Sequence, residues 1–348
     1  MGQFNAGEPT RANAAASAGG KCMIAGEYSV LLPGGWALAV ATRGGVTARA
    51  TPSESWSFQR EELKLNWVPG DAPMGPVRFG SAVTEALRRR GVAPLALSTT
   101  SGAIGGHGGP KQGLGSSASA VVAMVAAAIE ADRRRHASAL HPSLLLEIAC
   151  ESHADAQGGR GSGYDVATIA TGGLVAFQPT KGEVVSIPWP ADLHACLIHT
   201  GGSAKTPDRI AAWEALGDVE SRATLMEPLS ATTQGVIHAF RAGHPEKILP
   251  AIAATQDALI CLDDDHALGI APATARGICG AIRAAGAIPR ISGAGGGDSI
   301  LAFASSPAIL LDAARRARSA GGIPLDVDLP GPAVQVHGGG VEPHPPLQ

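Results

Sequence analysis

The sequence is short of cysteine, and this shortage excludes two kinds of small stabilised protein. Five cysteines are present at scattered positions, with no Cys-x-x-Cys pair: Cys22, Cys150, Cys196, Cys261 and Cys279. Their number and spacing indicate neither a disulfide framework nor a zinc site. A reducing, cytoplasmic compartment is therefore expected.

Positive charge in excess and a long apolar run are also missing. The formal net charge is -3 over 348 residues, so no general basic surface is present that would attract a nucleic acid or an acidic membrane. The longest largely apolar run, 118–129, is shorter than the roughly 20 residues needed to cross a bilayer. The start of the chain has no basic segment followed by an apolar one, so no export signal is predicted. We expect a small molecule as the partner, with no nucleic acid and no membrane.

The order of the periodic segments predicts a mixed α and β chain in two parts. Residues 1–18 show no periodic apolar pattern and are expected to form a disordered tail. Alternating apolar residues predict antiparallel strands within 36–67. The following residues predict helices at 79–90, from the end of the glycine-rich loop 102–115 to about Arg135, and at 143–156. They predict strands at 95–100, 173–177, 184–187 and 195–200.

A proline-rich connection at 188–190 is the predicted domain boundary. Beyond it the chain is mostly helical until Ala287. A strand, a glycine loop, a second strand at 300–304, a helix at 307–320 and two short strands are predicted to follow.

The most specific motif is Lys111-Gln112-Gly113-Leu114-Gly115-Ser116-Ser117-Ala118, in which glycines lead directly into the start of a helix. Glycines allow the backbone to approach a ligand and to adopt positive φ. The free N–H groups of a first helical turn attract phosphate. The motif is neither a Walker A loop nor a dinucleotide fingerprint. The alternative interpretation is a glycine hinge before a serine-capped core helix.

Gly113 to Ala118 resembles the central motif of the GHMP kinase superfamily, and two further segments resemble the other motifs of that family. Gly20-Lys21-Cys22-Met23-Ile24-Ala25-Gly26-Glu27-Tyr28 is similar to the first, and Ile291-Ser292-Gly293-Ala294-Gly295-Gly296-Gly297-Asp298 to the third. The three motifs follow the family order and extend over nearly the whole chain. The resemblance implies an ATP-dependent small-molecule kinase that uses Mg²⁺.

The resemblance also implies an α+β fold of two domains. Residues 19–190 would form an N-terminal, ATP-binding domain like domain 2 of ribosomal protein S5, and residues 191–340 a ferredoxin-like C-terminal domain. The active site would lie in the cleft between them. Oligomeric state stays open, with a homodimer as one option.

Within the superfamily, the sequence resembles the phosphomevalonate kinase branch of bacteria and fungi. The features in common are the sequence Ile24-Ala25-Gly26-Glu27-Tyr28, Asp298 after the third glycine run, and the segment Thr200-Gly201-Gly202-Ser203-Ala204-Lys205-Thr206. Departures from the branch occur at Ser299, Ser203 and Lys205. The alternatives are mevalonate kinase or another GHMP kinase, and a non-catalytic ligand sensor on the same fold.

The resemblance assigns catalytic roles to Lys21, Asp165 and Lys111. Lys21 would contact the transferred phosphoryl group or lower the pKa of the acceptor, and Asp165 would act as base or orient the acceptor. Without the resemblance, Lys21 would be interpreted as an exposed lysine at a strand edge, Lys111 as a solvated loop charge, and Asp165 as a helix N-cap.

The remaining expected site residues fall into three groups. The nucleotide would be bound by Gly113, Leu114, Gly115, Ser116, Ser117 and Ala118. The acceptor would be bound by Lys111, Ser162, Gly163, Ser203, Lys205, Arg290, Ser292, Gly293, Ala294 and Gly295. Magnesium would be bound by Ser117 and by a carboxylate of the helix that precedes the Asp165 loop, either Glu151 or Asp155.

Overall fold

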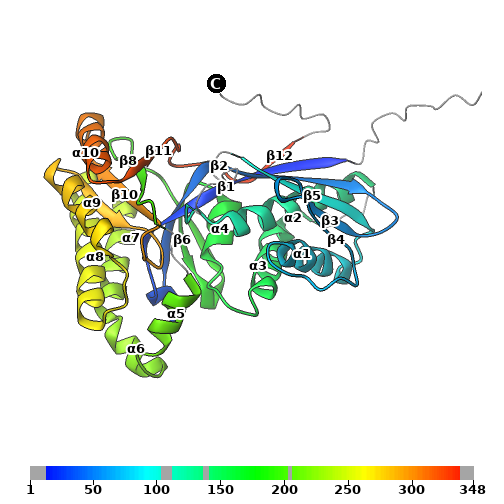
Figure 1. Cartoon of the computed structure of the whole chain (residues 1–348), viewed down its shortest axis with the longest axis horizontal. Helices are drawn as coiled ribbons and strands as arrows, with labels where there is room; N and C mark the ends of the chain where they lie inside the picture. The colour runs from blue at the N-terminus through cyan, green and yellow to red at the C-terminus, as the bar shows by residue number, and fades with distance from the viewer. Residues whose placement is uncertain (1–12, 103–111, 136–140, 203–205, 338–348) are drawn as a thin grey trace, which may run out of the picture.

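The computed structural model describes residues 13–102, 112–135, 141–202 and 206–337, which form two sheets with helices packed on them (Figure 1). The first sheet has the order β12-β1-β2-β5-β3-β4, with β6 and β7 joined to it through β2. Its strands are Ala14–Ala25 (β1), Ala37–Pro52 (β2), Ser57–Arg60 (β3), Leu65–Trp67 (β4), Leu95–Ser101 (β5), Leu174–Gln178 (β6), Glu183–Ile187 (β7) and Gln335–His337 (β12).

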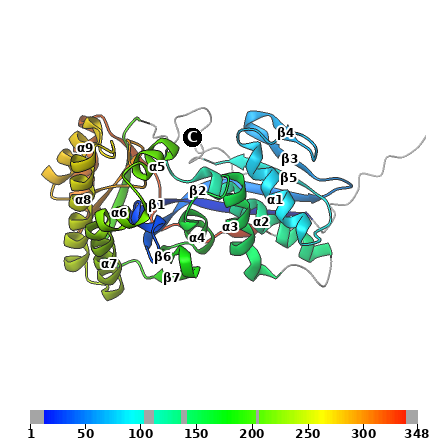
Figure 2. The ribbon, with the colours of Figure 1, turned by 90° about the horizontal axis from the view of Figure 1, so that it is seen from below.

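The long antiparallel strands β1 and β2 form the centre of this sheet. One half of β2, Val46–Pro52, pairs with β5, and the other half, Ala37–Val40, pairs with β6. The register between β1 and β2 shifts between Gly19 and Gly20 and again between Met23 and Ala25, and such irregularities bend and twist a strand. The pair thereby extends from one lobe of the molecule into the other, as Figure 2 shows.

Strand β1 begins earlier than expected, at Ala14, so the prediction that residues 14–18 belong to a disordered tail is wrong. Ala16 and Ala18 are buried there, and Ala16 pairs with Ala48 on one side and with Val336 on the other. Alanine has a low intrinsic preference for strands. Pairing on both edges and burial under a helix outweigh this preference, and neither can be recognised from the local sequence.

Four helices cover the first sheet: Val77–Arg89 (α1), Ser116–Arg135 (α2), Leu145–Ala156 (α3) and Tyr164–Thr171 (α4). Helix α2 is the central one and packs on β1 and β2. Its buried residues include Ala118, Ala123 and Ala127, and these small side chains let the helix lie close to the alanines of β1.

The second sheet is antiparallel, with the order β11-β8-β10-β9. Its strands are His194–His199 (β8), Ile288–Ile291 (β9), Ser299–Ala304 (β10) and Ile323–Leu325 (β11). Its helices are Thr206–Glu214 (α5), Val219–Leu225 (α6), Glu227–Ala242 (α7), Pro245–His266 (α8), Ala273–Ala284 (α9) and Pro307–Ser319 (α10). Strand, helices, strand, strand, helix and strand follow one another in the ferredoxin-like manner, which confirms the expected α+β class.

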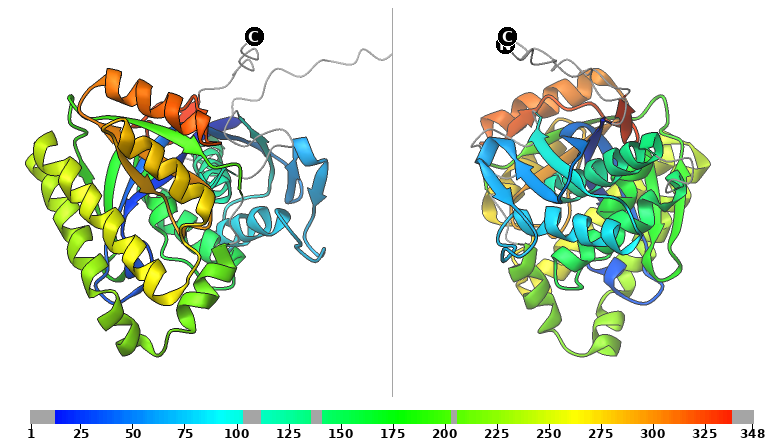
Figure 3. Two further views of the ribbon diagram at one scale, coloured as in Figure 1. Left: turned by 60° about the vertical axis from the view of Figure 1, so that its left-hand side comes forward. Right: turned by 90° about the vertical axis from the view of Figure 1, so that its right-hand side faces the viewer.

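Both faces of the second sheet are covered. Along β10, Ile300 and Ala302 face the cluster under α9 and α10, whereas Leu301 and Phe303 face α7, α8 and the start of the first sheet, as the alternation of a strand requires. Figure 3 shows α7 and α8 side by side beneath this sheet. The two lobes therefore share one apolar cluster, in which Leu301 and Phe303 meet Ile24 and Leu38.

The change from the first sheet to the second falls between β7 and β8, where residues 188–190 lie. The last strand, β12, does not stay with the second sheet and pairs instead with β1. The C-terminal part of the chain thus closes the first sheet. No helix of the described residues is long and apolar enough to cross a membrane.

A buried ion pair joins the two lobes. Arg290 of β9 and Glu27, in the turn after β1, are fully buried and in direct contact. The Arg290 guanidinium also donates to the carbonyl oxygens of Ile24, at 2.6 Å, and Ile291, at 2.9 Å. Gln256 of α8 accepts from the Ile291 N–H at 2.9 Å. The end of β1 is therefore fixed to β9 by charge as well as by hydrogen bonds.

Removal of either partner of this pair should destabilise the protein strongly, because it leaves the other charge buried and unpaired. Glu27→Leu and Arg290→Met should each lower the free energy of unfolding by about 3 to 5 kcal/mol, and the double variant with both changes by much less than the sum. Urea denaturation followed by circular dichroism measures this. As a control, Arg283→Ala removes the exposed pair with Asp257 and should change the free energy by less than about 1 kcal/mol. Additive single effects in the double variant would contradict the argument.

Candidate active site

The three glycine-rich segments, which are far apart in the sequence, meet at one place. The backbone N–H of Lys21 donates to the carbonyl oxygen of Leu114 at 2.9 Å. The N–H of Met23 donates to the hydroxyl of Ser292 at 2.9 Å. The Ser299 hydroxyl donates to the carbonyl oxygen of Gln112 at 2.7 Å. Each segment is thus hydrogen-bonded to another one directly.

The second segment has the geometry of an anion site at the start of α2. Gly113 and Gly115 have φ of 71° and 78°, where other residues are strained. A Cβ on Gly113 would lie 2.8 Å from the Cβ of Asp298, and one on Gly115 would lie 3.1 Å from Cε of Lys21. Leu114 and Ala118 are buried, whereas Ser116 is exposed and Ser117 half-buried. The N–H groups in the first turn of α2, at these serines, can donate hydrogen bonds to phosphate oxygens. The residues present therefore fit a nucleotide.

Lys21 lies at this site and is buried, which excludes the interpretation of an exposed lysine at a strand edge. Its ammonium donates to the carbonyl oxygen of Gly113 at 3.0 Å and lies 5.4 Å from the ring centre of Tyr164. Burial alone would lower the pKa of Lys21, but Tyr164 and the charge of Asp165 outweigh burial and hold that pKa above its ordinary value. Lys21 is therefore a stable cation at neutral pH.

Asp165 lies in the first turn of α4, close to Ser117 and to the buried His153. Its Oδ2 is 3.8 Å from Nε2 of His153, and the same nitrogen is 3.2 Å from the Ser117 hydroxyl. Its Oδ1 accepts from the Val166 N–H at 2.9 Å. The N-cap of α4 is Gly163, not Asp165, so the N-cap interpretation of Asp165 is wrong. The carboxylate keeps a fifth of its surface exposed and can reach a ligand.

Glu151 and Asp155, the predicted magnesium ligands on α3, contact arginines in this structure. Glu151 forms ion pairs with Arg89 and Arg90, and Asp155 pairs with Arg89 at 3.1 Å. These contacts lie between α1 and α3. The arginines neutralise both carboxylates, and the side chain of α3 that does face Ser117 is His153.

His153 is the residue that the motif analysis missed, although its helix carried a signal. On α3, Ile148, Ala149, Ser152 and His153 are buried, and they follow the three-and-four spacing of a helical inner face. At about 100° per residue, Glu151 lies outside the arc of the helix that these four residues occupy. The period of the helix, applied to all its polar residues, therefore predicts that His153 points inward and that Glu151 points out.

One part of the third segment packs against other residues of the protein, and another part faces space that could accommodate a ligand. Gly295, with φ of 73°, is needed because a Cβ there would lie 2.5 Å from the carbonyl oxygen of Ile270. Among the described residues, no atom lies within 4 Å of a Cβ placed on Gly293. The Ala294 carbonyl oxygen accepts from the Tyr28 hydroxyl at 2.6 Å. Ser292 accepts from Met23 and, as a hydroxyl, can still donate. Gly293 and Ser292 are the members of this loop that can approach a ligand.

Arg290, expected to bind a phosphate of the acceptor, does not have this role. Its side chain is fully buried and its nitrogens bond to Glu27, Gln256 and two backbone carbonyl oxygens. Burial lowers the pKa of this guanidinium, and the Glu27 charge opposes that change. Arg290 is a structural residue.

Five expected residues remain to be placed. Ser162 and Gly163 are half-buried and lead into α4, beside Asp165. Lys111, Ser203 and Lys205 lie outside the described residues. Thr200, which precedes the latter two, donates to the carbonyl oxygen of Gly297, so the described start of that segment is joined to the third glycine loop.

Comparison with known proteins decides the family. Residues 80–173, which include the second glycine segment, His153 and Asp165, match the model of the GHMP kinases N terminal domain. The chain therefore carries a GHMP kinase N-terminal domain. As a GHMP kinase it is an enzyme of the kinase class, and GHMP kinases use ATP.

Relatives of this GHMP kinase cover nearly its whole length. The phosphomevalonate kinase of Streptomyces sp. (strain CL190) is 25% identical, over 88% of this chain and 94% of its own. The mevalonate kinase of Aeropyrum pernix is 27% identical, over 84% and 88%. The solved Streptococcus pneumoniae phosphomevalonate kinase, in complex with phosphomevalonate and AMPPNP, has a TM-score of 0.77 at 21% identity, covering 90% of this chain and 99% of that one. This last likeness establishes the fold.

His153 should act as a positioning residue for Ser117 and Asp165. His153→Leu removes the polar atom that both approach, and misplacement of reacting groups should lower kcat by about tenfold to hundredfold. His153→Gln, which keeps a polar side chain, should recover a large part of the rate. Coupled ADP-release assays with the best acceptor, together with calorimetry for nucleotide affinity, separate the effect on kcat from that on binding. His141→Gln, on an exposed histidine, is the control. An unchanged kcat in His153→Leu would contradict this role.

Proposed function

We propose that this GHMP kinase transfers the γ-phosphoryl group of ATP to 5-phosphomevalonate, giving diphosphomevalonate and ADP, a step of the mevalonate pathway of isoprenoid synthesis. The observation that carries the proposal is the meeting of Lys21, Asp165 and the start of α2 at one place. A cation, a carboxylate and a phosphate-binding helix end are the parts that phosphoryl transfer needs.

The nucleotide phosphates would lie on the N–H groups of Gly115, Ser116 and Ser117 at the start of α2. Within the described residues no group of three His, Cys, Asp or Glu side chains could hold a metal alone. Magnesium usually takes one or two protein oxygens and completes its shell with phosphate and water. The Ser117 hydroxyl, at the start of α2, fits this requirement. When bound, the ion would neutralise charge on the phosphates.

Lys21 and Asp165 would have opposite tasks in the reaction. An oxygen of the acceptor phosphate forms a bond to the γ-phosphorus while the bond from that phosphorus to the β,γ-bridging oxygen breaks, and ADP leaves. Lys21, held as a cation, would stabilise charge on the transferred group. Asp165 would orient the acceptor and accept a proton where the acceptor oxygen carries one.

Three features favour phosphomevalonate as the acceptor. Asp298 follows the third glycine run and packs on Gly113, and the Streptomyces relative and the Streptococcus neighbour are phosphomevalonate kinases. A second phosphate beside ATP adds about two negative charges at neutral pH and needs cations to hold it. With Arg290 engaged by Glu27, Lys111 and Lys205 are the remaining candidates.

The alternative is mevalonate kinase, which the 27% identity to the Aeropyrum enzyme supports. A non-catalytic ligand sensor is disfavoured, because such a protein would be expected to lose Lys21 or Asp165. For compartment we propose the cytoplasm. All five cysteines are free thiols, as a reducing environment requires.

The enzyme should prefer an acceptor that already carries a phosphate group. ADP release should be fastest with phosphomevalonate in a panel that includes mevalonate, diphosphomevalonate, homoserine and galactose. Lys111→Ala should raise the KM for phosphomevalonate about 10-fold to 100-fold, since a charge-assisted hydrogen bond contributes roughly 1.5 to 3 kcal/mol. ATP affinity should change little. Lys64→Ala, on an exposed lysine far from the site, serves as control. A higher kcat/KM for mevalonate would replace this proposal by the mevalonate kinase alternative.

Asp165 should be needed for turnover and not for nucleotide binding. Asp165→Asn keeps the size of the side chain and removes its charge, so kcat should fall by about 10²-fold or more. Stopped assays of ADP release measure kcat, and calorimetry with a non-hydrolysable ATP analogue should give nearly the same affinity as the original enzyme. Near-normal turnover of Asp165→Asn would remove Asp165 from the proposed chemistry.

A further inference from the structure

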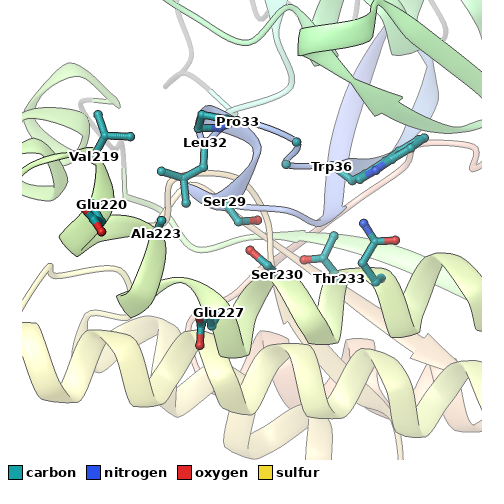
Figure 4. Close-up of a pocket in the computed structure, with 13 residues that line it drawn as sticks. Ser29, Leu32, Pro33, Trp36, Val219, Glu220, Ala223, Glu227, Ser230 and Thr233 are labelled. Carbon is teal, nitrogen blue, oxygen red and sulfur yellow. The ribbon is translucent and has the colours of Figure 1, made fainter.

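A second cavity, apart from the three glycine segments, lies between the loop after β1 and the helices α6 and α7 (Figure 4). Its volume is about 510 Å³, which is in the range of small-molecule sites, roughly 300 to 1,000 Å³. The loop, residues 29–36, forms one wall. Helix α6 and the first two turns of α7 form the other.

The loop separates this cavity from the candidate active site. Val30 packs with Met23 and Ala37 against Tyr164, whose ring faces the Lys21 ammonium. The neighbouring Ser29 instead lines the cavity. The two sites therefore lie on opposite sides of one loop and do not share these residues.

An unpartnered hydroxyl points to a ligand in the cavity. Ser29 is 1% exposed, and its Oγ has no hydrogen-bond partner among the described residues. A buried polar atom without a partner is unfavourable and uncommon. Figure 4 shows that Ser29 and Ser230 converge here from the loop and from α7. A ligand with a hydrogen-bond donor would satisfy Ser29.

The charge of the lining selects the kind of ligand. Glu220 and Glu227 are the charged residues of the lining, and no lysine or arginine is among the described residues that line it. Glu220 lies in the first turn of α6 and Glu227 in the first turn of α7. Leu32 and the indole of Trp36 add an apolar wall that can pack on a carbon chain and attract a cation. An anion is disfavoured, and a bare metal ion would leave most of the volume unfilled.

We propose that this cavity binds a small organic cation of the alkylamine class. Its ammonium groups pair with Glu220 and Glu227 and donate to the Ser29 hydroxyl, and its carbon chain packs against Leu32 and Trp36. The proposal does not depend on which acceptor the enzyme phosphorylates.

Calorimetry on the full chain tests the ligand class with a matched pair of probes. 1,6-Diaminohexane should bind, whereas 1,6-hexanediol, which has the same chain without charge, should not. Binding of the diamine should persist at saturating non-hydrolysable ATP analogue. Absence of diamine binding, equal binding of the diol, or displacement by the nucleotide analogue would overturn the proposal.

Variants locate the bound amine. Glu227→Gln and Ser29→Ala should each weaken diamine binding by about threefold to fivefold, and Ala223→Phe, which fills the cavity from α6, should abolish it. Glu54→Gln changes an exposed carboxylate in the loop before β3 and should leave binding unchanged. Thermal unfolding checks that each variant is folded, and Ser29→Ala, which only removes a hydroxyl, keeps the test decisive if Ala223→Phe is unstable. Unchanged affinity in Glu227→Gln and Ser29→Ala would show that the amine binds elsewhere, against the proposal.

Discussion

The buried pair of Glu27 and Arg290 is the contact on which the geometry of the site depends. Its two charges come from the turn after β1 and from β9, which belong to different sheets. A charge removed from water is tolerated only with a close partner and further hydrogen bonds, so the two sheets have one favourable arrangement at this point. That arrangement places Met23 against Ser292 and thereby joins the first glycine segment to the third.

Glycine makes the rest of this junction possible, for reasons that differ between positions. Gly113 leaves room for Asp298, and Gly295 leaves room for the backbone of Ile270. These glycines therefore serve the packing of protein on protein, whereas Gly293 borders open space and is the one suited to a ligand. Ile270 is itself held by Asp263, whose carboxylate accepts its N–H at 2.8 Å. A glycine-rich motif thus combines backbone positions needed for assembly with positions needed for binding.

The sequence was sufficient to predict the motifs, the fold class and most elements, because each depends on local pattern. The helix at 79–90 and the strand at 95–100 are found at Val77–Arg89 and Leu95–Ser101. What it could not predict depends on long-range partners. The strand at Ala14 needs β12, from the other end of the chain, and the role of Arg290 needs Glu27. Charged residues beside a motif suggest that a ligand binds there, but in this structure Glu151 forms ion pairs with Arg89 and Arg90, and Arg290 with Glu27.

The engagement of Arg290 also limits how this enzyme could select a phosphorylated acceptor. Two phosphate groups of like charge can approach each other only where cations or N–H dipoles lie between them. Lys21 bonds to Gly113 and lies at the start of α2, where the proposed function assigns it to the transferred group. If the acceptor is phosphomevalonate, as proposed, selectivity for its phosphate would then rest on Lys111 and Lys205. Gln112 accepts from the Ser299 hydroxyl, and Gly202 donates to the Thr200 hydroxyl, which itself donates to the carbonyl oxygen of Gly297. Movement of the third glycine loop would therefore also move Gln112 and Thr200, together with the phosphate-binding backbone.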